Sequence, residues 1–189
     1  MNVLSDRIQR LAESETIAMS QKSRDLKALG HDVINLSLGE PDFNTPEIIK
    51  KAGIQAIKDN VSHYTPVPGL VEVRTSICKK LKRDNALDYS IDQIVVSTGA
   101  KQSLMNTVLC LVNPGDKVVV ATPYWVSYKE MIGFAQGEMI EVKAGVEQNF
   151  KITPQQLDEH LDRDTKLFMF SSPSNPTGGA YSKDEMLAL

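Results

Sequence analysis

A glycine between a short apolar run and a helical pattern offers the chemistry of an anion site. Residues 94–96 are apolar, the pattern breaks at Gly99, and Leu104, Val108 and Val112 then recur at helical spacing. The first turn of a helix presents backbone N–H groups without intrahelical partners, together with the positive end of the helix dipole. We expect a phosphate there, because glycine lets the main chain approach a ligand closely. The alternative is an ordinary strand-to-helix turn of an α/β protein.

Four more residues in loops could contact a ligand. Trp125, the single tryptophan, directly follows an apolar run, and its indole can stack on a planar heteroaromatic ring or pack in the core. Asn175 lies among prolines, and its amide can bind a phenolic oxygen or a carboxylate, or it can form a turn. Gly39 would let a small substrate group approach the main chain, or it would take a positive φ. Tyr64, in a proline-rich loop, could reach a phosphate or pack.

Strands alternate with helices along the chain. Short apolar runs predict strands at 33–38, 94–96, 117–121, 139–142 and 166–170. Apolar residues at helical spacing predict one or two helices over 6–29, ended by Gly30, and further helices over 45–57, 70–81, 99–112, 126–135 and 152–161 and from 182 onward. This alternation favours an α/β fold, a mostly parallel sheet with helices on both faces.

Polar loops rich in glycine and proline follow four of the predicted strands. They read GEPDF, STGAK, TPYW and SPSNPTGG. The carboxyl ends of parallel strands meet at one edge of a sheet, which is where α/β proteins bind ligands. The four loops therefore predict a single ligand site at that edge.

Composition indicates which classes of partner to exclude and which cellular compartment to expect. A net charge of −3 argues against a nucleic-acid-binding surface, which would be basic. No apolar run reaches bilayer length and no signal peptide precedes the first helix, so we expect no membrane partner and a cytoplasmic protein. Neither Cys78 and Cys110 nor the three histidines have ligand spacing, so we expect no metal site.

Five motifs in a fixed order resemble a known family. They are GEPDF-x-TP, HYTPVPGLVEVR, STGAKQSL, NPGDKVVVATPYWVSY and SPSNPTGG. Together they resemble the N-terminal part of class I aminotransferases, which are enzymes of fold type I that use pyridoxal 5′-phosphate (PLP). The resemblance extends from about Leu26 to the last residue and is strongest to the prokaryotic aspartate aminotransferases.

The resemblance implies roles for the residues that could hold the cofactor. The backbone amides of Ala100 and Lys101, beside Gly99, would bind the PLP phosphate, in agreement with the anion site expected at the helix start. Trp125 would stack on the pyridine ring. Asn175 would bind the phenolic oxygen of that ring.

The resemblance also implies how substrate and subunits meet. The main chain of Gly39, with Trp125 and Asn175, would contact the amino-acid substrate, whose α-carboxylate Gly39 and Asn175 would bind. Tyr64 would reach the phosphate held by a neighbouring subunit. We therefore expect a homodimer with shared sites that acts on small amino acids and 2-oxo acids.

The catalytic residues of the family are expected outside this chain. The Schiff-base lysine would lie beyond Leu189, so no catalytic residue is assigned within the chain. Lys101 is placed beside an anion and is not expected to be the nucleophile. Residues 1–45 would form an N-terminal arm and part of a small domain, and residues 46–189 the incomplete N-terminal part of the large PLP-binding domain.

The expected function is transfer of an amino group between an amino acid, aspartate-like by resemblance, and a 2-oxo acid. We expect the chain by itself to be inactive and to bind PLP weakly at best. A PLP-dependent lyase or decarboxylase of the same fold and a non-catalytic aminotransferase-like binding domain are the alternatives. A nucleotide-binding α/β protein is a further one, although the chain has no P-loop or complete GxGxxG pattern.

Overall fold

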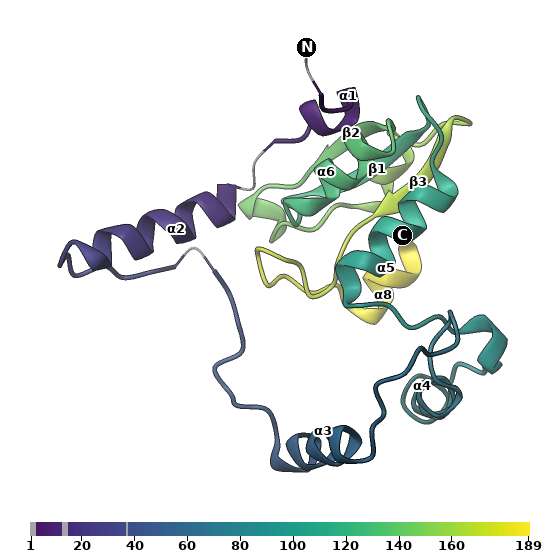
Figure 1. Cartoon of the computed structure of the whole chain (residues 1–189). Coiled ribbons are helices and arrows are strands. Elements are labelled where there is room, and N and C mark those ends of the chain that lie inside the picture. Colours follow the sequence, from purple (N-terminus) through teal and green to yellow (C-terminus); the bar gives the residue numbers. More distant parts are fainter. Residues whose placement is uncertain (1–2, 13–14, 37) are drawn as a thin grey trace. The chain divides into compact units, whose positions relative to one another are not determined.

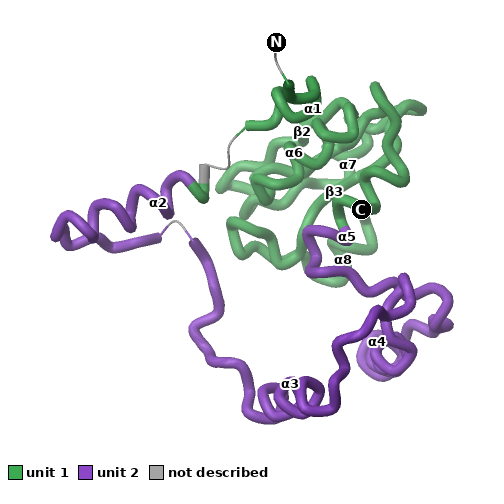
Figure 2. The backbone as a smooth tube through the Cα atoms, viewed as in Figure 1, with its two compact units in different colours: residues 1–17, 104–189 green, residues 18–103 purple. Residues whose placement is uncertain are grey.

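The computed structural model describes residues 3–12, 15–36 and 38–189, and their contacts divide the chain into two compact units. Unit 1 contains residues 1–17 and 104–189, and unit 2 contains residues 18–103 (Figure 2). These units do not test the domain boundary that we expect at residue 45, which therefore stays a prediction.

A parallel three-stranded sheet forms the centre of unit 1. Its strands are β1 (Lys117–Thr122), β2 (Glu138–Lys143) and β3 (Thr165–Met169), with β1 between the other two (Figure 1). The continuous apolar run of β1 suits this central position, because a strand flanked by neighbours and covered on both faces excludes water completely. Its three valines, 118 to 120, are fully buried.

Helices cover both faces of this sheet. Successive side chains of a strand point to opposite faces, so Val118 and Val120 of β1 share one core with residues of α5 (Ala100–Leu111) and α6 (Ser127–Phe134). Val119 faces the other core, with Ile152 and with Leu157 of α7 (Pro154–Asp158). The predicted α/β architecture is confirmed.

The remaining elements of unit 1 are short. They are α1 (Asp6–Gln9), the 3₁₀ turn η2 (Val146–Gln148) and α8 (Lys183–Ala188). Thr153 before α7 and Ser182 before α8 both form capping boxes, in which the hydroxyl accepts a backbone N–H three residues later. Both helix starts lie within about one residue of the sequence prediction.

Unit 2 consists of helices and connecting segments. It contains most of α2 (Glu15–Ala28), then α3 (Glu47–Lys58), α4 (Val71–Asn85), the 3₁₀ turn η1 (Ile91–Gln93) and the first turn of α5. The predicted N-terminal helical region is therefore two helices, α1 and α2, and Gly30 ends α2 with a φ of +88°. Arg74 of α4 is buried and its Nη1 donates to the carbonyl oxygen of Ile91, 3.0 Å away.

Two predicted strands are absent from the part of the chain that the structure describes. Residues 94–96 and the described residues of 33–38 are not strands, and Ser37 lies outside the described residues. Ile34 and Leu36 are largely exposed, at 84% and 90%. An apolar run becomes a strand only where another strand pairs with its backbone, and neither run is paired in the described sheet.

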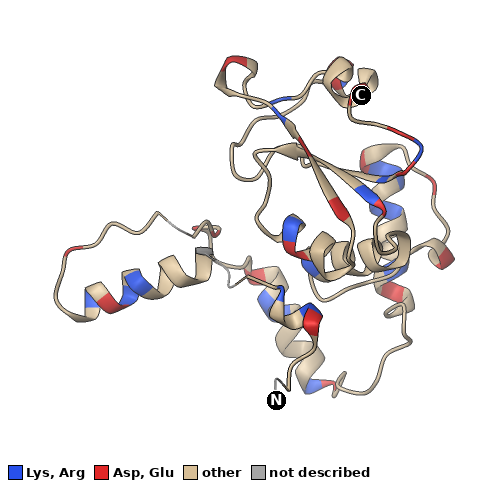
Figure 3. Cartoon of the chain, turned by 90° about the horizontal axis from the view of Figure 1, so that it is seen from above, with Lys and Arg blue, Asp and Glu red and all other residues tan. Residues whose placement is uncertain are grey.

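Charged residues of both signs are distributed over the structure. Figure 3 shows lysine and arginine positions interspersed with aspartate and glutamate positions along the same helices. Among the helices described, none has the length and apolar character that crossing a membrane would need. The described residues contain no cluster of three or more side chains suited to holding a metal ion.

Candidate functional site

The glycine turn before α5 has the backbone conformation that an anion site at a helix start requires. Gly99 has a φ of +83°, which glycine adopts at no steric cost. Its carbonyl oxygen accepts the N–H groups of Gln102 and Ser103 at 3.2 and 3.4 Å. The N–H groups of Ala100 and Lys101 therefore belong to the first helical turn, for which the helix itself supplies no acceptor. This is the arrangement expected from the sequence.

Trp125 lies in the short segment between β1 and α6 and rests against a buried tyrosine. The ring of Tyr128 meets the indole edge-on, with centroids 5.8 Å apart and an interplanar angle of 82°. Tyr128 is 6% exposed and belongs to the core between α6 and the sheet. This contact holds the indole against the core between α6 and the sheet.

Tyr124 completes this aromatic group. Its ring stacks on Tyr128 at 6.4 Å, and its hydroxyl donates to a carboxylate oxygen of Glu141, 3.2 Å away. Burial raises the pKa of Tyr124, and the negative charge of Glu141 raises it further. Tyr124 therefore stays protonated as a hydrogen-bond donor and fixes the segment that carries Trp125 to β2.

Asn175 lies in the loop that follows β3. Its backbone N–H donates to Oγ of Ser171 at 3.2 Å. The loop closes through two backbone bonds, from the Ser174 N–H to the Gly179 carbonyl (2.7 Å) and from the Gly178 N–H to the Ser174 carbonyl (2.8 Å). Asn175 is exposed, so its amide side chain is presented at the surface by a closed turn.

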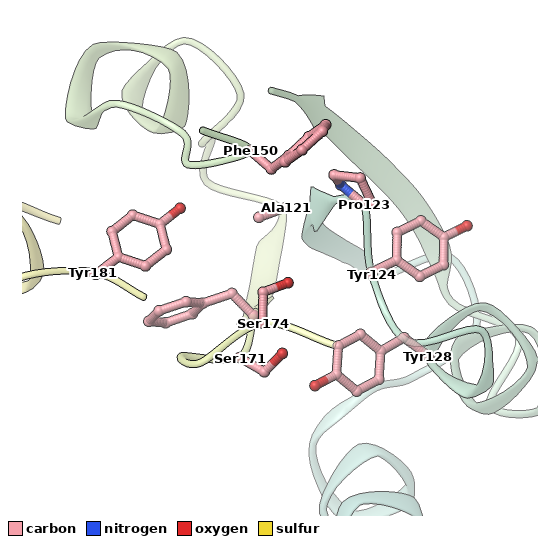
Figure 4. A pocket seen from close by; sticks show the side chains of 9 residues that line it. Ala121, Pro123, Tyr124, Tyr128, Phe150, Ser171, Ser174 and Tyr181 are labelled. Atoms are coloured by element: carbon pink, nitrogen blue, oxygen red, sulfur yellow. The ribbon is translucent and has the colours of Figure 1, made fainter. Parts of the chain in front are cut away.

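Residues of both loops take part in lining a pocket, which Figure 4 shows from close by. It is lined by residues from the ends of β1 and β3 and from neighbouring loops, which are Ala121, Pro123, Tyr124, Tyr128, Phe150, Phe170, Ser171, Ser174 and Tyr181. Trp125 and Asn175 are not among the lining residues. The residues that contact them, Tyr128 and Ser171, are.

Gly39 and Tyr64 belong to unit 2. Gly39 does not have a positive φ, and a Cβ built on it would meet no described atom within 4 Å. Neither strain nor packing among the described residues requires a glycine there, which disfavours the structural explanation of this residue. Tyr64 is fully exposed on its loop.

Unit 1 brings two of the predicted site residues to one edge. Trp125 follows β1 and Asn175 follows β3, and these strands are parallel neighbours. Gly39, Tyr64, Gly99, Ala100 and Lys101 belong to unit 2. The roles of all seven residues stay predictions.

The sequence analysis missed the residues that hold Trp125 and Asn175 in place. Tyr128 appeared only as the last residue of an aromatic motif, and Ser171 and Tyr181 were not singled out. A serine four residues before an asparagine carries no recognisable signal.

Comparison with known proteins gives consistent matches. The profile described as "Aminotransferase class I and II" matches residues 31–189. A probable aspartate/prephenate aminotransferase of Rhizobium leguminosarum bv. phaseoli is 51% identical over the whole chain, which covers 47% of that protein. The aspartate aminotransferase of Bacillus subtilis is 43% identical, with 98% of this chain and 47% of that protein covered.

A solved structure agrees with these relatives. The aspartate aminotransferase from Thermus thermophilus with maleate matches the whole chain with a TM-score of 0.96 and 38% identity, and 49% of that chain is covered. The chain thus spans about half the length of the curated relatives it matches.

Proposed function

Because this chain belongs to the class I and II aminotransferase family, we propose that it forms the N-terminal part of an enzyme that moves an amino group between an amino acid and a 2-oxo acid. Its relatives named above carry aspartate in their names, which makes aspartate the amino acid to test first. The enzyme would be cytoplasmic. The observation that carries the proposal is the family match over residues 31–189, and the helix start at Gly99, which we predict to bind an anion, lies inside it.

The residues present fit the cofactor that this family uses. A phosphate needs several backbone donors at a close approach, and the positive φ of Gly99 followed by the first turn of α5 provides them. In the proposed site the amides of Ala100 and Lys101 hold the phosphate of PLP. Lys101 adds a positive charge near that anion.

Trp125 and Asn175 would hold the ring of the cofactor. The indole, which packs against Tyr128 in a perpendicular ring contact, would stack on the pyridine ring and exclude water from one face. The amide of Asn175 would donate to the phenolic oxygen and stabilise its deprotonated form. When bound, PLP supplies the electron sink on which removal of an amino group depends.

The substrate would be bound by main-chain and amide groups. The Gly39 backbone and the Asn175 side chain would bind the α-carboxylate and fix the orientation of the amino acid. Tyr64 would reach the phosphate of a partner subunit, so that the active enzyme is a homodimer. The lysine that carries PLP and moves the proton would lie outside residues 1–189.

The test compares the complete protein with the chain that ends at Leu189. We expect the complete protein to show the visible absorbance of bound PLP and to convert aspartate and 2-oxoglutarate to oxaloacetate and glutamate. The chain alone should give no turnover in the same assay. The proposal is wrong if the PLP-loaded complete protein releases carbon dioxide or ammonia from amino acids without forming a new amino acid, or if it binds no PLP.

A further inference from the structure

The loop that carries Asn175 is held at its base by aromatic and hydroxyl contacts. The hydroxyl of Tyr181 accepts the backbone N–H of Ile152 at 2.8 Å, and its ring meets Phe170 edge-on at 5.7 Å. The N–H of Tyr181 donates to Oγ of Ser172, 3.0 Å away. Both ends of the loop are thus fixed to unit 1.

The tip of the loop has less support. Ser171 and Ser174 line a pocket on one side of the loop (Figure 4). Asn175 itself is exposed. The backbone bonds between Ser174 and the 178–179 segment close the turn, but they do not fix how Asn175 is oriented relative to β3.

A side-chain hydrogen bond links the Asn175 backbone to the end of β3, and Ser171 supplies it. Ser171 is the second residue after β3, and its Oγ accepts the Asn175 N–H at 3.2 Å. This bond holds the peptide plane on the N-terminal side of Asn175 next to the end of β3. Rotation of that plane would redirect the whole amide side chain.

We infer that Ser171 is a positioning residue, whose hydroxyl fixes the orientation in which the Asn175 amide is presented at the carboxyl edge of the sheet. The inference rests on the proposed function for its consequence, which is a hydrogen bond from Asn175 to the phenolic oxygen of PLP. A donor at that oxygen stabilises its deprotonated form, so loss of the bond raises the pKa of the bound chromophore. Ser171 acts through Asn175 and does not itself touch the cofactor.

The chain offers a matched control and a conservative replacement. Ser174→Ala removes a hydroxyl from the same loop and the same pocket wall, but the Ser174 side chain makes none of the bonds described above. Ser171→Thr keeps a hydroxyl at the same position.

The first measurement needs no cofactor. Hydrogen exchange of the Asn175 amide is followed by mass spectrometry with fragmentation in the complete, PLP-free protein. Ser171→Ala should speed this exchange about 2- to 10-fold, the range for loss of one neutral hydrogen bond. Ser174→Ala should leave it unchanged and Ser171→Thr should restore it. Equal exchange in the two alanine variants would overturn the inference.

The second measurement is the pH titration of the visible absorbance of the PLP-loaded protein. Asn175→Ala should raise the pKa of the chromophore, Ser171→Ala should raise it by a smaller amount, and Ser171→Thr should return it to the parent value. A shift with Asn175→Ala but none with Ser171→Ala overturns the positioning role alone. No shift with Asn175→Ala overturns the proposed role of Asn175 and the inference with it, whatever the exchange measurement shows.

Discussion

Replacing Gly99 with alanine isolates the backbone contribution to the proposed phosphate site. Gly99 has a φ of +83°, and a Cβ built on it would meet no described atom within 4 Å. The cost of Gly99→Ala is therefore conformational and not a clash. An L-residue in this region costs about 1–2 kcal/mol.

Whether that cost lowers the stability or the affinity for PLP depends on whether the turn keeps its conformation in the absence of PLP. If the turn keeps its φ without the cofactor, the strain lowers the free energy of unfolding and leaves the affinity for PLP unchanged. If the turn relaxes, the strain returns on binding and weakens the affinity by about 5- to 30-fold, since 1.4 kcal/mol is tenfold. We expect the two losses to sum to about 1–2 kcal/mol.

Gly30 provides the matched control. Its φ is +88°, and its Cβ would also meet nothing within 4 Å. It follows α2, where the N–H of His31 donates to the carbonyl oxygen of Leu26 at 3.1 Å, a bond typical of a glycine helix end. Gly30→Ala should therefore cost stability by a similar amount and leave PLP affinity at the parent value.

The assay combines PLP titration, followed by tryptophan fluorescence, with denaturant unfolding of the PLP-free protein. Gly99→Ala should lower affinity or stability by the stated total, and Gly30→Ala stability alone. If Gly99→Ala leaves both quantities at the parent values, the strain argument is wrong. If hydrogen exchange shows that the turn of the Gly99→Ala variant relaxes without PLP, and the affinity for PLP is nevertheless unchanged, the phosphate is not bound there.

Three further changes test separate parts of the structure. Trp125→Ala should weaken PLP binding at least about 2- to 10-fold, from lost stacking, and Trp125→Phe should weaken it less, both measured by absorbance titration. Lys151 donates a 2.5 Å hydrogen bond to Glu185 and lowers the pKa of that carboxyl below 4.5. The stabilisation is present above that value and lost as pH falls through the lowered pKa, so Glu185→Gln should destabilise at neutral pH and match the parent in acid unfolding curves. Gly137→Ala would place a Cβ 2.8 Å from a core side chain and should cost about 1–3 kcal/mol, whereas Gly133→Ala, in open space on α6, should add about 0.5–1 kcal/mol, both by denaturant unfolding.

The elements of unit 1 could be predicted because their signals are local. The run VVVA, residues 118–121, has no polar residue on either face, which suits a covered central strand, and β1 occupies that position. Thr153 and Ser182 identify the starts of α7 and α8 because a capping box is completed within four residues.

The predicted strand at 94–96 shows the limit of this reasoning. Its residues are as apolar as those of β1, yet Val95 is 67% exposed and the run is not part of the described sheet. The Val96 N–H instead donates to the carbonyl of Pro68 at 3.0 Å, a loop contact. Strand formation depends on a partner, and no local pattern states which segment that partner is.

The same distinction separates the parts of the candidate site. The helix start at Gly99 is a backbone feature, set by one glycine and the helix that follows, and so it was visible in the sequence. The contact from Ser171 to Asn175 depends on how the thirteen-residue connection between β3 and α8 folds back on itself, which spacing does not determine.

The pairing of β1 with β3 is what makes Trp125 and Asn175 candidates for one ligand. They are fifty residues apart in sequence, but Val120 of β1 pairs with Met169 of β3, so the two strands run out at the same edge. Had β2 been the central strand, the loops after β1 and β3 would be separated by its width, about 10 Å in all. An indole that stacks on the face of a ring and an amide that binds an oxygen at the edge of the same ring need the shorter spacing. The strand order β2-β1-β3 supplies this spacing. The contacts of Tyr128 with Trp125 and of Ser171 with Asn175 then hold these two residues at the carboxyl ends of β1 and β3.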